Sequence, residues 1–181
     1  MKAKVLIIPG IGDSSPSHWQ SLWQQADPVA FSRIELLPPE WDEPRCARWV
    51  AAIAKAVQRL GPDTILVAHS LGCLAVAHWA SSSSARAGGA LLVSPPDTSR
   101  PAFPDQAISF SPVPLEPLPF PSIVVASSND PYLTVGHARV CAELWRSRFH
   151  EAGAGGHLGA SNGLGDWPAG KALLDELRHG E

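Results

Sequence analysis

Short apolar runs alternate along this chain with longer segments in which apolar residues recur at intervals of three or four positions. The runs predict six buried strands, at residues 5–8, 34–37, 64–68, 90–93, 123–127 and 148–151. The segments between them predict helices at residues 17–26, 44–60, 71–82, 134–146 and 169–178. Strands that alternate with helices form parallel βαβ units, and uninterrupted apolar strands are typical of a sheet covered on both faces. We therefore expect an α/β fold with a doubly wound, mostly parallel six-stranded sheet flanked by helices.

One long segment, residues 95–121, interrupts this alternation. It holds nine of the eighteen prolines and shows no convincing helical pattern. Because proline lacks an amide N–H and resists both helix and sheet, we expect an extended connection packed across the surface. A connection of this length is often functional, so we also expect part of it to border the functional site.

A serine stands at the junction between the third predicted strand and the helix that follows it. Ser70 is flanked by Ala68 and Gly72 in the pattern small-x-Ser-x-Gly. In a nucleophile elbow, a strained turn lifts the serine hydroxyl above the end of a sheet, and small neighbours let strand and helix approach closely. The strand–turn–helix context favours this elbow over a buried structural serine. The motif therefore predicts Ser70 as a catalytic nucleophile.

A serine nucleophile needs a histidine base, and the histidine needs an acid that fixes its tautomer. In proteins with this elbow, the acid and then the histidine follow the serine along the chain, in loops at strand ends. His157, in a glycine-rich loop after the last predicted strand, is the expected base. Asp130 follows the preceding strand and is the expected acid, with Asp97 and Asp166 as alternatives.

Each of these assignments has a structural alternative. Asp130 could cap the helix that begins near Thr134, and His157 could be an ordinary loop residue. The other histidines have no expected catalytic role. His69 is expected to pack within the elbow and His150 to lie in a strand, and three histidines fall on predicted helices, namely His78, His137 and His179.

The loop after the first predicted strand contributes to the same site. We expect the oxyanion to be held by the backbone N–H groups of Leu71 and Ile11. The glycines of this loop lack the Lys-Ser/Thr ending of a phosphate-binding loop, so nucleotide binding is disfavoured. The expected substrate-binding residues are Gly10, which allows the turn, and three residues near the mouth of the site, His18, Trp19 and Trp41.

Composition limits the remaining possibilities. A chain of 181 residues with 45% hydrophobic content predicts a single domain over residues 1–181. The net charge of −3 and the scattered basic residues disfavour nucleic acid as a partner. Three cysteines without paired spacing predict no metal site and a reduced, cytoplasmic protein. No apolar run is long enough for a signal peptide or a membrane span.

The chain resembles the small α/β-hydrolases that include the bacterial YdeN-type proteins and the vertebrate retinoblastoma-binding serine hydrolase. The likeness covers nearly the whole chain and rests on residues 7–10, 18–20, 67–73, 126–132, 156–157 and 161–168. It implies a minimal hydrolase fold, a triad of Ser70, Asp130 and His157, and serine hydrolase activity on small esters or amides. Ala68 departs from the glycine of many relatives, and we expect it to tighten the elbow rather than abolish it.

These observations predict a cofactor-free enzyme that forms an acyl-enzyme on Ser70 and takes a small-molecule ester or amide as substrate. It is expected to resemble the carboxylesterases. The alternative is a protein-interaction module that keeps the hydrolase scaffold without significant turnover. A third possibility is lyase or perhydrolase chemistry at the same site. A protein partner is possible, but no feature of the sequence identifies one.

Overall fold

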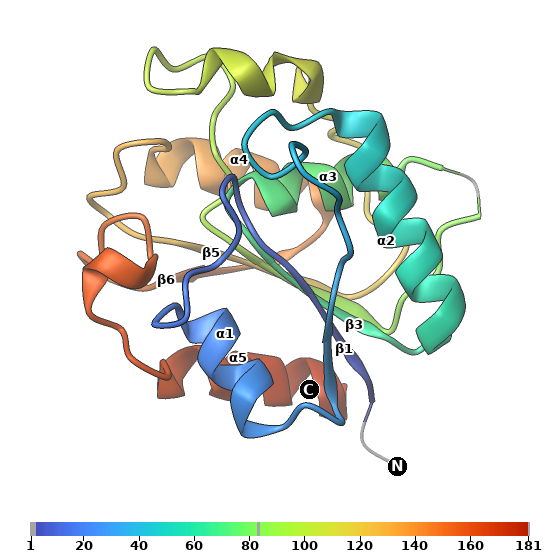
Figure 1. The fold of residues 1–181 in the computed structure, drawn as a ribbon. Helices are drawn as coiled ribbons and strands as arrows, with labels where there is room; N and C mark the ends of the chain where they lie inside the picture. The colour runs from blue at the N-terminus through green and yellow to red at the C-terminus, as the bar shows by residue number, and fades with distance from the viewer. Residues whose placement is uncertain (1–2, 83, 181) are drawn as a thin grey trace.

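The computed structural model describes residues 3–82 and 84–180. Six strands form one parallel sheet with the order β2-β1-β3-β4-β5-β6 (Figure 1). The strands are β1 (Val5–Ile8), β2 (Phe31–Arg33), β3 (Ile65–His69), β4 (Gly89–Val93), β5 (Ser122–Ala126) and β6 (Arg148–Glu151). The expected α/β fold is therefore confirmed, and every strand pair is parallel.

Five α-helices cover the two faces of this sheet. They are α1 (Trp19–Ala26), α2 (Cys46–Leu60), α3 (Leu71–Ala80), α4 (Val135–Trp145) and α5 (Pro168–His179). Their ends agree within two residues with the ranges predicted from the sequence. In Figure 1, α2, α3 and α4 lie above the sheet, and α1 and α5 lie below it. No helix of the described residues is long and apolar enough to cross a membrane.

Alternate side chains of the central strands enter two separate cores. On β1, Leu6 and Ile8 pack toward α2 and α3, whereas Val5 and Ile7 pack toward α1 and α5. All four side chains are fully buried. Because both faces are covered, each central strand is apolar at every position, which explains why the sequence shows runs rather than alternation.

The second strand is the one whose predicted position was wrong. It spans Phe31–Arg33 and pairs with β1, whereas the apolar run at residues 34–37 lies after it. Ile34 still donates its N–H to the Ile7 carbonyl, but Leu37 is 81% exposed. The run was misleading because β2 lies at the edge of the sheet, where a strand needs little apolar surface.

The proline-rich segment crosses the carboxyl-end side of the molecule and is the yellow-green chain at the top of Figure 1. It contains a short 3-10 helix, η1 (Asp105–Phe110), that the sequence pattern did not indicate. Ala107 and Phe110 anchor this helix in the core, where Phe110 packs edge-on against Trp49 at 5.7 Å between ring centroids. The segment is thus held by apolar anchors rather than by a sheet or a long helix.

Candidate active site

The turn between β3 and α3 has the geometry of a nucleophile elbow. Ser70 has φ 54° and ψ −125°, a strained conformation for a residue with a side chain. Its backbone N–H donates to the Val93 carbonyl at 2.9 Å, which helps to hold the turn on the sheet. A Cβ atom on Gly72 would lie 2.3 Å from the Ile8 oxygen and 2.5 Å from the Pro9 oxygen. Glycine is therefore required here because α3 begins in direct contact with the end of β1.

A histidine and an aspartate complete a hydrogen-bonded chain with this serine. His157 Nε2 lies 2.8 Å from Ser70 Oγ, and His157 Nδ1 lies 2.8 Å from Asp130 Oδ2. The Asp130 side chain is fully buried and also accepts the Tyr132 N–H at 2.9 Å. An acceptor carboxylate at Nδ1 keeps the proton on that nitrogen, so Nε2 is free to accept the serine proton.

The other two acids lie in different surroundings. Asp97 is 3.5 Å from His137 and accepts two hydrogen bonds from Ser99. Asp166 pairs with Lys171 at 3.1 Å on the surface. Of the three aspartates weighed from the sequence, the structure brings Asp130 to His157.

Two backbone amides lie beside the serine. Leu71 is the first residue of α3, whose N-terminus carries the positive end of the helix dipole. The loop after β1 passes close to Ser70, because a Cβ atom on Gly10 would lie 3.0 Å from the Ser70 Cβ. Neither the Leu71 nor the Ile11 N–H donates a hydrogen bond to any group in the part of the chain that the structure describes. Both amides are therefore available to an oxygen placed above Ser70.

A cavity of about 350 Å³ opens over Ser70. One wall comes from the proline-rich segment through Pro96, Phe103, Pro104 and Gln106, so this segment borders the site as expected. Three polar residues also line the cavity and form what is called its polar end: Asp13, Ser14 and His18. The rest of the lining comes from the residues around Ser70, namely Gly10, Ile11, His69, Leu71, Tyr132, His157, Gly159 and Ala160.

His18 has an unusual environment at the polar end of this cavity. The ring is buried, its Nδ1 accepts the Gln20 N–H at 3.1 Å, and its Nε2 has no hydrogen-bond partner. Burial, together with the positive charges of Arg33 and His157, lowers the pKa of His18 to about 4. The ring is therefore neutral near pH 7, with Nδ1 as acceptor and the proton on Nε2.

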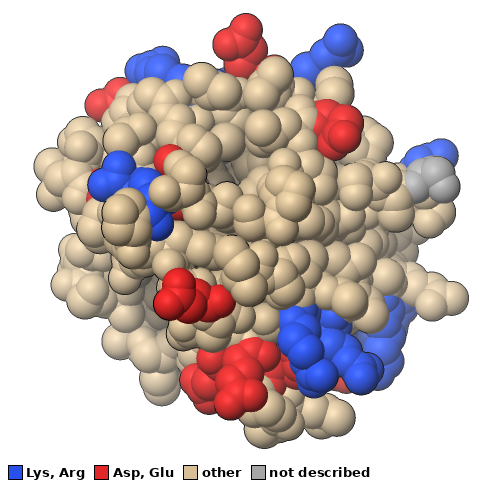
Figure 2. All heavy atoms as spheres, turned by 90° about the horizontal axis from the view of Figure 1, so that it is seen from above, with Lys and Arg blue, Asp and Glu red and all other residues tan. Residues whose placement is uncertain are grey.

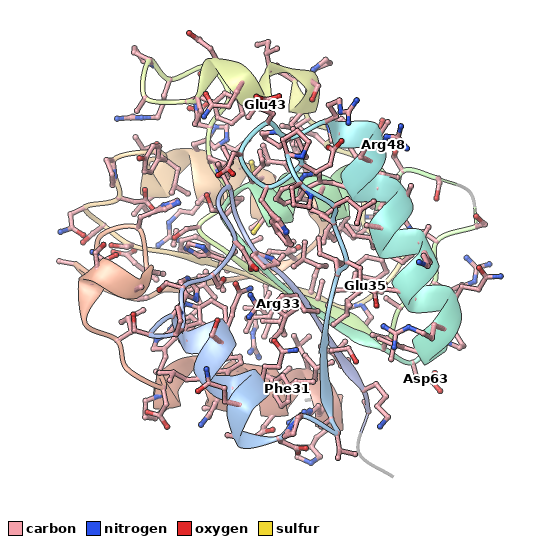
Figure 3. The ribbon with its side chains drawn as sticks, viewed as in Figure 1. Phe31, Arg33, Glu35, Glu43, Arg48 and Asp63 are labelled. Carbon is pink, nitrogen blue, oxygen red and sulfur yellow. The ribbon has the colours of Figure 1, made fainter. Side chains whose placement is uncertain are left out.

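Arg33 closes the outer side of this polar end. Figure 3 labels Arg33 on β2, from which its guanidinium reaches Asp13 in the loop after β1. The same group donates to Ser21 Oγ at 2.9 Å and to Gln24 Oε1 at 3.1 Å. These bonds tie the loop to α1 and β2 and neutralise the Asp13 charge next to the cavity.

Trp19 and Trp41 do not line the cavity, and their predicted place at the substrate site is not supported. Trp19 is 1% exposed, and its Nε1 donates to the Leu158 carbonyl at 2.9 Å. Trp41 packs edge-on against Trp49, and its carbonyl accepts the Gly12 N–H at 2.8 Å. Trp19 is thus a core residue and Trp41 is a partly buried residue packed against the core, since spacing along the chain does not reveal where a ring points.

Two residues near the hydrogen-bonded chain of Ser70, His157 and Asp130 make contacts that the sequence did not reveal. The Tyr132 ring lies 4.6 Å from the His157 ring, and Tyr132 lines the cavity. His69, which was expected only to pack within the elbow, has its Nε2 2.8 Å from the His157 carbonyl oxygen. The only sequence signal for these contacts was proximity along the chain. Tyr132 follows Asp130 by two residues, and His69 directly precedes Ser70.

Comparison with known proteins agrees with this arrangement. A family model described as Serine hydrolase matches residues 5–176. This chain belongs to the serine hydrolase family. A comparison with curated protein sequences found no match.

Solved structures extend the likeness of this serine hydrolase. A YdeN-like hydrolase from Pectobacterium atrosepticum is 31% identical with a TM-score of 0.86, over 98% of this chain and 91% of that one. The ydeN gene product of Bacillus subtilis is 24% identical with a TM-score of 0.77, over 97% and 98% of the two chains. The carboxylesterase CesB from Bacillus subtilis, at 12% identity and a TM-score of 0.68 over 99% and 85%, shares the fold.

The distribution of charge on the face shown in Figure 2 does not indicate a particular class of ligand. Figure 2 shows Lys and Arg together with Asp and Glu scattered near the edge of one face, with mostly uncharged surface between them. Among the described residues, no group of three or more His, Cys, Asp or Glu side chains could hold a metal ion.

Proposed function

We propose that this serine hydrolase cleaves small esters or amides through an acyl-enzyme on Ser70. The observation that carries the proposal is the continuous hydrogen-bonded chain from Ser70 Oγ through His157 to Asp130, with both links at 2.8 Å. Ser70 also lies at the base of a cavity, where a carbonyl carbon could reach its oxygen. This combination supports nucleophilic acyl transfer as the reaction.

The proposed reaction has two halves. The Ser70 oxygen forms a bond to the substrate carbonyl carbon while His157 Nε2 takes the hydroxyl proton. The Leu71 and Ile11 amides stabilise the resulting oxyanion, and the imidazolium then gives its proton to the leaving group as the bond to that group breaks. A water molecule, deprotonated by His157, attacks the acyl-enzyme and releases the carboxylic acid. Asp130 orients the ring throughout.

The cavity supports a small substrate. Its volume of about 350 Å³ is at the lower end of the roughly 300–1,000 Å³ usual for ligand pockets. Phe103 and Pro104 offer an apolar wall for a short acyl or alkyl group, and His18 offers a neutral N–H donor at the polar end. We propose a short-chain ester, of the carboxylesterase class, as the preferred substrate. The buried, unpaired cysteines support a reducing, cytoplasmic environment.

A fluorophosphonate probe tests the proposed nucleophile directly. Intact mass should show one phosphonyl adduct on the wild-type protein and none on Ser70→Ala, and peptide mapping should place the adduct on Ser70. The two proteins should have matching circular dichroism spectra, because Ser70 contributes little buried apolar surface. A folded wild-type protein without an adduct from pH 6 to 9 would favour the non-catalytic interaction module.

Turnover in water labelled with ¹⁸O then distinguishes the possible reactions. Hydrolysis of short-chain esters places one solvent oxygen in the product acid. A product without solvent oxygen would favour transfer to another acceptor or lyase chemistry over hydrolysis.

A further inference from the structure

A second cavity lies beside α4 and does not include Ser70, although it shares Pro96 with the cavity over that serine. It has a volume of about 310 Å³ and is bounded by α4 and by residues on both sides of η1. Its walls are mainly apolar, formed by Leu74, Pro95, Pro96, Pro112, Val113 and Leu115. His137, Cys141 and Asp97 also line it. This cavity therefore combines mainly apolar walls with a small group of titratable side chains.

These three side chains form a connected row. Cys141 Sγ lies 3.4 Å from His137 Nε2, and His137 Nδ1 lies 3.5 Å from Asp97 Oδ2. His137 and Cys141 are one helical turn apart on α4, whereas Asp97 comes from the loop after β4. Each ring nitrogen of His137 faces a different neighbour, so the three groups do not converge on one point as metal ligands would.

The aspartate determines the tautomer of the imidazole. Burial acts to raise the pKa of Asp97, but the hydrogen bonds from Ser99, the charge of Arg100 and the charge of His137 when that ring is protonated outweigh it and lower that pKa. The carboxylate is thus ionised near pH 7, and at 3.5 Å from His137 Nδ1 its negative charge favours the tautomer with the proton on Nδ1. His137 Nε2 is left with a lone pair that faces the thiol, as required of a base.

The thiol needs such a base. Burial, with a further contribution from the Asp97 charge, raises the pKa of Cys141 to about 11. Little free thiolate exists at neutral pH, so a reaction of the sulfur requires a neighbouring group that takes the proton as the new bond forms. His137 is within reach of that proton.

We propose that Cys141, His137 and Asp97 form a second reactive site, at which uncharged α,β-unsaturated carbonyl compounds add covalently to the Cys141 sulfur. The sulfur forms a bond to the β-carbon, and the π electrons move to the α-carbon as an enolate. His137 takes the thiol proton and returns it to the α-carbon, so the addition needs no oxidant or reductant. The apolar walls and the Asp97 charge favour an uncharged compound over an anion. Ser70 takes no part in this reaction.

The other cysteines provide internal controls. Cys46 has its pKa raised by burial to about 11, the same value as Cys141, but among the described residues its sulfur makes no hydrogen bond to a histidine. Cys73 is fully buried and donates to the Val93 carbonyl, so it reacts only when the protein unfolds. Comparing the reaction rates of Cys141 and Cys46 therefore tests for assistance by a base. Comparing those of Cys141 and Cys73 tests whether labelling requires unfolding.

The test is a time course with N-ethylmaleimide at pH 7 on folded Ser70→Ala protein, with each cysteine peptide quantified by mass spectrometry. Cys141 should react at least ~10-fold faster than Cys46, since general-base assistance contributes roughly 10²–10⁴-fold in favourable cases. His137→Phe should remove most of this advantage without changing the Cys46 rate. Asp97→Asn should reduce it by a smaller factor.

Three results would overturn the proposal. Cys141 could react no faster than Cys46, or its rate could be unchanged in His137→Phe. Equal rates at Cys141 and Cys73 would instead show that labelling follows unfolding. Because the nucleophile Ser70 is absent in the protein tested, none of these outcomes depends on whether the chain is an active esterase.

Discussion

His69 Nε2 lies 2.8 Å from the main-chain oxygen of His157, so the residue before the elbow serine holds the backbone of the proposed base. A carbonyl oxygen only accepts, and the proton of His69 therefore resides on Nε2. Burial, with added repulsion from His157 and His18, lowers the pKa of His69 well below its ordinary value. His69 is thus a neutral donor that links the elbow to the loop after β6.

This contact predicts that His69 positions the His157 ring. His69→Phe should lower kcat by about 10–100-fold with little change in KM, because small misplacement of a catalytic group can cost that much. His69→Gln should restore most of the rate, since its Nε2 can donate to the same carbonyl. Steady-state kinetics with a short-chain ester measure both effects. Equal losses in the two variants would indicate a packing role instead.

Asp130 should be the acid on which turnover depends. Asp130→Asn is expected to reduce kcat by about 10³–10⁴-fold, because an amide at Nδ1 permits the wrong histidine tautomer. Asp166→Asn is the matched control, since Asp166 pairs only with Lys171 at the surface. The measurement is kcat for both variants with a short-chain ester, with thermal melting to check that each variant is folded. Similar losses of kcat in Asp130→Asn and Asp166→Asn would show that Asp130 does not have its proposed role.

Gly72 should tolerate no side chain. Gly72→Ala places a Cβ atom 2.3 Å from the Ile8 oxygen, so β1 or α3 must move, and we expect a loss of about 3 kcal/mol or more in the free energy of unfolding. Gly136→Ala, in the first turn of α4, meets only the Thr134 hydroxyl at 3.8 Å and should gain about 0.5–1 kcal/mol. Urea denaturation measures both. Similar values for the two alanine variants would contradict the close approach at the elbow.

His18 should make the protein less stable in acid. Its pKa falls from 6.5 to about 4 on folding, so the unfolded chain binds this proton first as the pH drops. The contribution is fully present above pH 6.5 and is lost as the pH falls toward 4, by up to roughly 3 kcal/mol. His18→Asn keeps an acceptor for the Gln20 N–H but does not titrate.

Urea denaturation at pH 7 and pH 4.5 tests this expectation. The free energy of unfolding should fall less between these pH values in His18→Asn than in the wild type. His150→Asn, a change on the edge strand β6, serves as the comparison. An identical fall in wild type and His18→Asn would mean that other groups control the acid sensitivity.

The features predicted well from the sequence are those that depend on local chemistry. The five helices follow from the spacing of apolar residues along each segment, because a helix buries one stripe of its own surface. The elbow follows from Ala68, Ser70 and Gly72, because a strained turn between strand and helix requires small residues at fixed offsets. The order of acid and histidine after the serine also pointed to His157, whose Nε2 lies 2.8 Å from Ser70 Oγ and whose role as base stays a prediction.

The features predicted poorly depend on neighbours that are distant along the chain. The run at residues 34–37 was taken for a strand, because the sequence cannot show that β2 lies at an edge and needs little apolar surface. Trp19 and Trp41 were placed at the substrate site, whereas the Trp19 ring packs in the core and the Trp41 ring packs against Trp49. Ring direction is a property of packing rather than of spacing.

The sequence by itself determined an α/β fold, a serine elbow and three candidate acids at the same edge of a parallel sheet. Only the tertiary structure decided among those acids, because it brings Asp130 to His157 at 2.8 Å and Asp97 to His137 at 3.5 Å. The order of the strands in the sheet places the loops that carry these groups next to one another. Hydrogen bonds form only over a few ångströms, so small differences in loop position decide which groups pair. Chain order can therefore name the possible partners, but the packing of β4, β5 and β6 selects the pairs.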